Sequence, residues 1–203
     1  MSLYTIVFDN IHYLGMIWDS TQVAQLSNND MDHRIDMNGF PIRHGDVFKE
    51  PVRVSFEERG KEDEGLAKPD IAALQGRLYL SKAAYDVLAD LLKEDGEFLP
   101  LIDEGGNNAY LFTPLRIAED IDALDTALSK KNEWGDIEHL AFFEEKLKDW
   151  MVFRAEFNGY YTLQCKEIVK ITIQRAKLTG VFFTPDLGNY FSNQFDEKVI
   201  SDH

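Results

Sequence analysis

Five histidines are the side chains best suited to acid–base or metal chemistry, and they are scattered along the chain. No two of them share a predicted helix at H-x-x-x-H spacing, and the sequence has no H-E-x-x-H motif. His44 lies two residues before Asp46 in "RHGD", where a carboxylate could orient its imidazole. Such pairs of ionisable side chains more often stabilise a polar turn than form a functional site. The histidines therefore predict no metal site.

Cys165 is the only cysteine, which excludes an internal disulfide and a cysteine-based zinc site. At the N-terminus of a predicted helix its thiol could act as a nucleophile. Ser81 holds the matching position of a related segment, however, and this favours a helix cap or a buried thiol. The motifs G-x-S-x-G, C-x-x-C and the dinucleotide fingerprint are absent, and "DEGGNNA" lacks the lysine of a phosphate loop. We therefore expect no catalytic residue, no cofactor and no enzyme activity.

Carboxylates are the most abundant ionisable groups, with 36 acidic against 21 basic side chains and a net charge of −15. The stretch from Glu57 to Asp149 holds 23 acidic and 11 basic side chains, so it carries −12 of that charge. An acidic protein repels nucleic-acid phosphates and anionic lipids, and it attracts basic partners. A simpler explanation of the same charge is solubility. We expect neither nucleic acid nor a membrane surface as a partner.

Two runs within this stretch are the densest in carboxylates, and we expect them to form a partner-binding surface. Their residues are Glu57, Glu58, Glu62, Asp63, Glu64, Glu119, Asp120, Asp122 and Asp125. The four carboxylates of "AEDIDALD" could instead ligate a cation, although their spacing lacks the glycine turn of a calcium loop. A solvated helix face explains such a run more simply. A small enzyme or cation-binding protein is the alternative that these residues leave open. A further alternative is an uncharacterised module that only oligomerises.

The elements that must position these residues begin with short predicted strands at "YTIVF" and "LGMIWD". Val52, Val54 and Phe56 then alternate with polar residues, as in a half-buried strand. The charged stretch "EERGKEDEGLAKPD" has two glycines and one proline, which predicts a solvated loop.

A strand, a capped helix and a second strand are predicted across residues 76–102. "GRLYL" favours a strand, and Ser81 is placed to cap the helix that follows. The residues spaced to form the buried helix face are Ala84, Val87, Leu88, Leu91 and Leu92. Gly96 ends the unit's helical part, and "EFLPLI" returns to an extended chain.

The same spacing of a cap position and a glycine occurs in residues 163–185. Gly180 follows Cys165 by fifteen residues, as Gly96 follows Ser81. This register predicts a helix with Ile168, Ile171 and Ala176 inward. The β-branched run "IVKITI" equally suits a strand. The two segments are a weak internal repeat, and their shared residues are caps, apolar faces and stops. The repeat is therefore predicted to be scaffolding.

Between the two copies we expect helices at "LRIAEDIDALDTALSKK", from the spacing of Ile117, Ile121, Leu124 and Leu128, and at "IEHLAFFEEKLKDW". Asn158-Gly159 predicts a tight hairpin turn within "MVFRAEFNGYYTLQ". The pattern predicts an α+β fold with a mixed or antiparallel sheet, flanking helices and two weakly similar strand–helix–strand units. We expect one domain over residues 1–203. The alternative is two lobes, with a β-rich part at about 1–67 and the rest at 68–203.

No run of about eighteen apolar residues and no signal-peptide pattern is found in the sequence. A cytoplasmic protein is therefore expected, either as a monomer or as a homodimer.

Five segments in order give the chain a family resemblance. They are "KPDI", "LSKAAYDVLADLLKEDGEFLP", "YLFTPLRIAEDIDALDTALSK", "VFRAEF" and "KLTGVFFTP". Together they resemble bacterial polymorphic-toxin immunity family eleven, over about Lys68 to Pro185. Cys165 departs from the pattern, in which a serine is usual, and the first 56 residues lie outside it.

The resemblance implies a small cytoplasmic α+β protein that binds and neutralises a cognate toxin domain. Neutralisation by binding needs a complementary surface and no catalytic group. The acidity adds the expectation of a basic toxin, since opposite potentials raise association rates and specificity.

Overall fold

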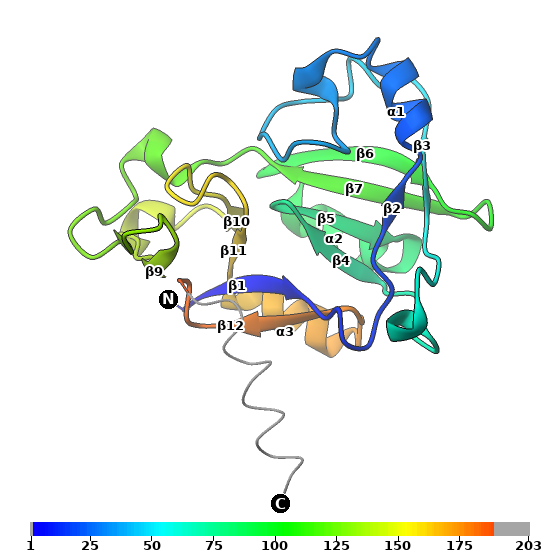
Figure 1. Cartoon of the computed structure of the whole chain (residues 1–203). Helices are drawn as coiled ribbons and strands as arrows, with labels where there is room; N and C mark the ends of the chain where they lie inside the picture. The colour runs from blue at the N-terminus through cyan, green and yellow to red at the C-terminus, as the bar shows by residue number, and fades with distance from the viewer. Residues whose placement is uncertain (1, 189–203) are drawn as a thin grey trace, which may run out of the picture.

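Two β-sheets and two helices that pack between and against them organise residues 2–188, the part of the chain that this computed structural model describes (Figure 1). The strands are β1 (Leu3–Phe8), β2 (Ile17–Trp18), β3 (Val52–Ser55), β4 (Ile71–Leu74), β5 (Arg77–Ser81), β6 (Gly96–Ile102), β7 (Asn108–Pro114), β8 (Lys130–Lys131), β9 (Ile137–His139), β10 (Val152–Phe153), β11 (Leu163–Lys166) and β12 (Val181–Thr184). The helices are α1 (Ser20–Leu26), α2 (Lys82–Leu92) and α3 (Glu167–Arg175), with 3-10 turns η1 (Met31–His33), η2 (Lys61–Asp63), η3 (Ala118–Ile121) and η4 (Glu144–Leu147).

The six-stranded sheet has the order β2-β3-β6-β7-β5-β4, and its strands are antiparallel except for the parallel pair β3 and β6. The four-stranded sheet has the order β10-β11-β1-β12 and is antiparallel throughout. Strands β1 to β3 come from the first 67 residues, and they are divided between the two sheets. The N-terminal stretch is thus an integral part of both sheets.

The predicted α+β class and its two strand–helix–strand units are confirmed. The first unit is β5-α2-β6 and the second is β11-α3-β12. In each unit one antiparallel strand lies between the two that flank the helix: β7 in the first and β1 in the second. The two helices contact each other, so their units share one core.

Helix α2 begins as predicted, because the Ser81 hydroxyl accepts a hydrogen bond from the Ala84 amide at 3.2 Å. Ala84, Leu88 and Leu92 are buried beneath it. Of the other residues predicted on this face, Leu91 packs at the edge of the core, whereas Val87 is 39% exposed.

Helix α3 is also a helix as predicted, but the predicted inward face was wrong. Val169 and Ile173 are buried, while Ile168 is 46% exposed and Ala176 is exposed. The reason is a shift of one residue in the repeat. The cap position of α3 belongs to Lys166, since Cys165 is still part of β11, where it pairs with Tyr4 and Val152.

The two long helices predicted between the units were wrong. After one turn at η3, Asp122 adopts the left-handed conformation (φ 54°), and Ala123 donates its amide to the Ala118 carbonyl. Leu124 then forms a β-bridge with Phe142. Residues 137–150 contain only β9 and η4. Aspartates that bond to nearby main-chain amides compete with a helix here.

The predicted hairpin exists as the pairing of Val152 with Cys165, but its tight turn was wrong. Residues 154–162 form a longer loop, and the left-handed residues are Gly159 and Tyr160. Arg154 does not continue the pairing of β10 with β11, because it forms a β-bridge with Ile117. The loop that follows therefore turns away from β11.

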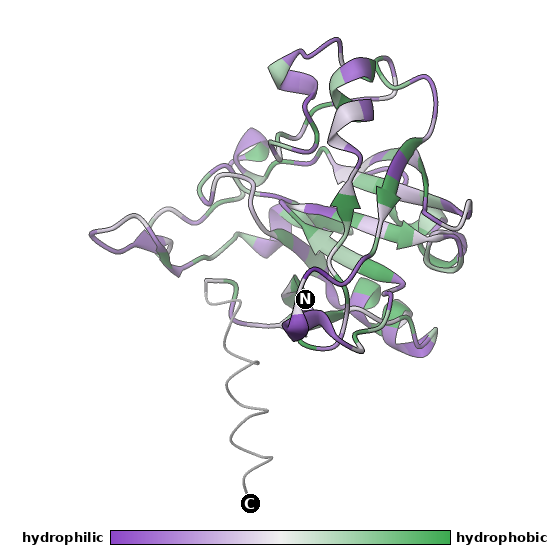
Figure 2. Ribbon diagram, turned by 45° about the vertical axis from the view of Figure 1, so that its right-hand side comes forward, coloured by the Kyte–Doolittle hydropathy of each residue, from purple (hydrophilic) through white to green (hydrophobic). Residues whose placement is uncertain are grey.

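The six-stranded sheet is buried on both faces. One face packs against α2 and α3 through Leu78, Leu80 and Phe112. The other packs under α1 and the residues that follow it, through Tyr79, Leu99 and Leu111. Figure 2 shows the hydrophobic strands inside and hydrophilic residues along many of the outer loops. Within residues 2–188, no helix is long and apolar enough to cross a lipid bilayer.

Candidate functional site

The first predicted acidic run lies in the loop after β3, around η2. Glu57, Glu58, Glu62 and Glu64 are exposed, and Asp63 is half-buried. Part of the run stabilises its own loop, because Asp63 accepts the Arg59 amide at 2.9 Å and Glu58 accepts the Gly65 amide at 3.0 Å.

The second predicted run lies at η3 and in the chain that follows it. The Glu119 carboxylate accepts the main-chain amides of Glu156 and Phe157, each at 2.9 Å. Asp125 accepts the amides of Ala127 and Leu128 at 3.0 and 3.1 Å. Asp120 and Asp122 are exposed. Glu119 and Asp125 therefore stabilise the backbone by accepting main-chain amides. The run is not the helix face that its spacing suggested.

The two acidic runs lie far apart. Figure 1 shows η2 at the lower right and η3 at the upper left of the molecule. They cannot form one continuous surface. Nor do the carboxylates of the second run meet His44 or His139, and no group of three metal-ligating side chains is found within residues 2–188. The described residues therefore do not bring together the ligands that the cation-site alternative requires.

His44 is fully buried, and it does not pair with Asp46, whose side chain is in solvent. Its Nε2 accepts from Nη2 of Arg77 at 3.2 Å. Burial, with the nearby Arg77 charge second, lowers the pKa of His44 from 6.5 to about 3. The imidazole is thus neutral near pH 7 and structural. Cys165 is likewise buried, and burial raises the pKa of its thiol, so it is an unreactive core residue.

Two buried arginines were not singled out by the sequence analysis. Arg77 is 1% exposed and Arg154 is 0% exposed. Arg77 donates to the carbonyls of Ile35 at 3.2 Å, Asn38 at 2.7 Å and Phe40 at 3.1 Å. Neither guanidinium forms an ion pair with a carboxylate in the described part of the chain.

Arg154 joins three separate segments. It donates to the carbonyls of Gly39 at 2.5 Å and Pro114 at 2.9 Å, and it reaches that of Gln75 at 3.4 Å. The β4–β5 turn packs so closely here that a Cβ at Gly76 would overlap the Tyr160 carbonyl and the Arg154 side chain. Residues 35–40, the β4–β5 turn and the end of β7 thus converge on Arg154, the first residue of the 154–162 loop.

Burial lowers the pKa of Arg77 to about 10 and that of Arg154 to about 9, so both remain charged near pH 7. A buried charge is costly unless its hydrogen bonds are made. Here main-chain carbonyls accept from the terminal guanidinium nitrogens, and four of these carbonyls belong to residues 35–40. The Nε atom of each arginine has no hydrogen-bond partner within the described residues. The result is a firmly held loop that exposes 56% of Met37 and 48% of Phe40.

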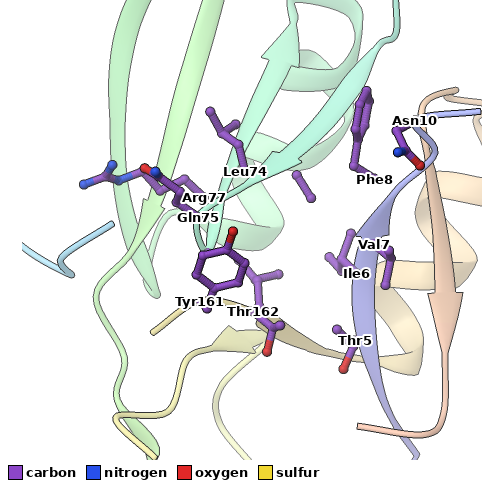
Figure 3. Close-up of a pocket in the computed structure, with 13 residues that line it drawn as sticks. Thr5, Ile6, Val7, Phe8, Asn10, Leu74, Gln75, Arg77, Tyr161 and Thr162 are labelled. Atoms are coloured by element: carbon purple, nitrogen blue, oxygen red, sulfur yellow. The ribbon is translucent and has the colours of Figure 1, made fainter. Parts of the chain in front are cut away.

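A hollow of about 340 Å³ lies between β1, the β4–β5 turn and residues 161–163 (Figure 3). Its walls are mainly apolar, with Ile6, Val7 and Leu74 among them. Figure 3 shows Tyr161 between the turn and β1, while the Arg77 head group points away from β1. Tyr161 is 62% exposed and also lines a second hollow beside β9. It therefore stands as a ridge between two depressions.

Negative charge surrounds the neighbouring Tyr160. The pKa of its phenol is raised by burial and then by the charges of Glu156, Glu119 and Asp120. Glu156 and Asp120 are exposed, whereas Glu119 is engaged with the loop amides. Part of the second predicted run thus lies beside the tyrosine ridge.

The sequence did carry a signal for this site. Arg77 in "GRLYL" begins a buried apolar strand, and Arg154 in "VFRAEF" lies between buried Phe153 and Ala155. An arginine inside a strand that is otherwise buried must bond to something internal. Its partners are carbonyls of distant loops, which spacing along the sequence does not reveal.

The arrangement is suited to binding and shows no reagent set. Neither a carboxylate, a histidine nor a cysteine is among the residues that line the first hollow. The rigid loops, an exposed tyrosine and a shallow apolar hollow are features of surfaces that dock another protein. No protein-family model matches the chain, and no curated protein sequence matches it.

Proposed function

We propose that this protein is an immunity protein, which binds a cognate bacterial toxin domain and neutralises it without catalysis. The observation that carries the proposal is the convergence of the 35–40 loop, the β4–β5 turn and the end of β7 on buried Arg154, the first residue of the 154–162 loop. Loops fixed in this way can present a preformed surface, and preformed surfaces lose less conformational entropy on binding. The ordered resemblance to immunity family eleven supplies the class of partner.

The chemistry of the surface supports binding over catalysis. A general base and its partner must lie within hydrogen-bond reach of each other in an accessible site. His44 is buried against Arg77, and Cys165 is buried in β11. Exposed Asp120 and Glu156 lie beside Tyr160, while exposed Lys131 lines the second hollow with Tyr161. The excess of carboxylates suits a basic protein surface.

Co-expression tests the proposal. The toxin domain encoded beside this gene is expressed in a bacterial host, alone or together with this chain. Growth should be restored only when the chain is present, and the two purified proteins should form a stable complex. If the chain is abundant and folded but the host still dies, the proposal is wrong.

A further inference from the structure

We infer that the partner docks on one defined surface, the Tyr161 face, which consists of Phe40, Asp120, Glu156, Tyr160, Tyr161 and the first hollow beside them. The occupant is a basic segment of the partner protein. One of its side chains enters the hollow, and its lysine or arginine groups lie against Asp120 and Glu156. The inference rests on the proposed function and adds the place and the chemistry of binding.

The first argument is the exposure of large side chains on a rigid support. Tyr161 is 62% exposed and Phe40 is 48% exposed. Phe40 is held through its own carbonyl by Arg77, and Gly39 beside it is held by Arg154. Tyrosine is enriched among the residues that dominate binding energy, and an anchor that is already fixed loses little entropy.

The second argument is the hollow itself. Its volume of about 340 Å³ is at the lower end of the range for ligand pockets, which suits a protruding side chain. Thr5 lines it and is fully buried, and the Thr5 hydroxyl has no hydrogen-bond partner within the described residues. A side chain with an apolar stem and a polar end would fill the apolar walls and could bond to that hydroxyl.

The third argument is charge. Glu156, Glu119 and Asp120 all act on the Tyr160 phenol, so they lie together. The Glu119 carboxylate accepts the Glu156 amide at 2.9 Å, which places these acidic residues side by side. One lysine is near, since Lys131 Nζ lies 4.8 Å from the centre of the Phe157 ring, so the acidic residues outnumber it. An exposed aromatic residue beside carboxylates favours a cationic partner, through ion pairs and through contact of the cation with the ring face.

The other acidic run does not share these features. Glu57 to Glu64 lie in a loop on the far side of the molecule. None of these residues lines either of the two hollows beside Tyr161, and no large apolar side chain of this loop is exposed. This run therefore supplies the matched control for charge.

The test measures binding of the neighbouring toxin domain to four variants by surface plasmon resonance. Asp120→Lys/Glu156→Lys reverses two charges on the Tyr161 face, and Glu57→Lys/Glu62→Lys reverses two on the far loop. Tyr161→Ala removes the ridge, and Ile168→Ala removes a side chain that is 46% exposed on α3. Circular dichroism and thermal unfolding confirm that each variant is folded. Glu119 is left unchanged because it holds the 154–162 loop.

We expect Tyr161→Ala to weaken binding by roughly thirtyfold, the effect of losing an anchor residue. Asp120→Lys/Glu156→Lys should slow association by roughly tenfold at low salt, and the difference from wild type should shrink at about 1 M salt. The two control variants should bind within about twofold of wild type. Equal binding by wild type and both Tyr161-face variants overturns the inference and leaves the proposed function standing.

A second probe does not depend on the toxin. A nona-arginine peptide is titrated into the isotopically labelled chain, and amide shifts are followed by NMR. We expect the largest shifts at Asp120 and residues 156–162. Larger shifts at residues 57–64, or no localised shifts, would overturn the inference even if the toxin does not bind and the proposed function fails.

Discussion

Three polar side chains within residues 2–188 fix loops through hydrogen bonds to main-chain atoms. Arg77 and Arg154 bind main-chain carbonyls, and Glu119 binds main-chain amides. Each connects residues more than 35 positions apart in the sequence. A single substitution at one of them should therefore affect a loop far from it in the chain.

His44 should make stability depend on pH. Its pKa in the folded protein, about 3, lies below its ordinary value of 6.5, so the unfolded chain binds a proton first as the pH falls. The stabilisation from neutral His44 is complete above about pH 6.5 and is lost progressively as the pH falls toward 3. Between pH 6.5 and pH 4 the loss is on the order of 3 kcal/mol.

The measurement is urea unfolding at several pH values, for wild type and for His44→Gln. The variant should be less stable near pH 7, but it should lose less stability on acidification, because it has no imidazole to protonate. Parallel pH curves for the two proteins would show that His44 does not titrate in this way.

Arg154→Met should loosen the 35–40 loop and the residues up to His44 that follow it. The change leaves the carbonyls of Gly39 and Pro114 without their donor, and unsatisfied buried groups cost about 1–3 kcal/mol each. Relief of the buried charge offsets part of this cost. We expect a net loss of about 2–4 kcal/mol and faster trypsin cleavage after Arg43, whose side chain is 69% exposed. The control is Arg59→Met, because Arg59 is exposed, and it should leave the stability and the rate of cleavage after Arg43 unchanged. An unaltered cleavage rate in Arg154→Met would refute the anchoring role of Arg154.

The elements show where sequence patterns succeed and where they fail. Helix α2 could be predicted from its Ser81 cap and apolar spacing, because both signals are local. Helix α3 could be predicted from the repeat, but its buried face could not, because Cys165 pairs with two strands and delays the start of the helix by one residue.

The segment from Ile117 to Leu128 failed as a helix for a different reason. Its apolar spacing is helical, yet Leu128 is 54% exposed and Ala118 and Ala123 are buried around Phe153. Burial against distant residues outweighs local helix propensity. The arginine-centred site could not be predicted either, since its hydrogen-bond acceptors are carbonyls of three distant segments.

Gly180 packs the second strand–helix–strand unit against the segment that leads into β4, and its replacement should be costly. Its φ is +99°, and an added Cβ would overlap the Ile71 carbonyl and Pro69 of the segment that leads into β4. Gly159 has a φ of +67° but nothing within 4 Å of an added Cβ. We expect Gly159→Ala to lose about 1 kcal/mol from backbone strain alone. Gly180→Ala should lose more than about 3 kcal/mol, since main-chain atoms must also move. Equal unfolding midpoints in urea for the two variants would contradict this account.

At the scale of the whole molecule, acidic loops and apolar hollows do not always lie on the same part of the surface. The net charge of −15 is spread over widely separated loops, so acidity alone does not identify an interface. Beside Tyr161, exposed carboxylates, exposed aromatic residues and an apolar hollow occur together on loops held from inside. We therefore propose that the partner binds that surface and that the acidity of the far loop serves solubility.

Hydrogen–deuterium exchange of the chain with and without its toxin domain tests the central claim most directly. If the protein neutralises the toxin by docking on the Tyr161 face, the complex should slow exchange in residues 35–44, 119–122 and 156–162. Residues 57–64 should exchange at the same rate in both states. Protection confined to residues 57–64 or to α3, or toxin inhibition with no protected surface at all, would contradict the account.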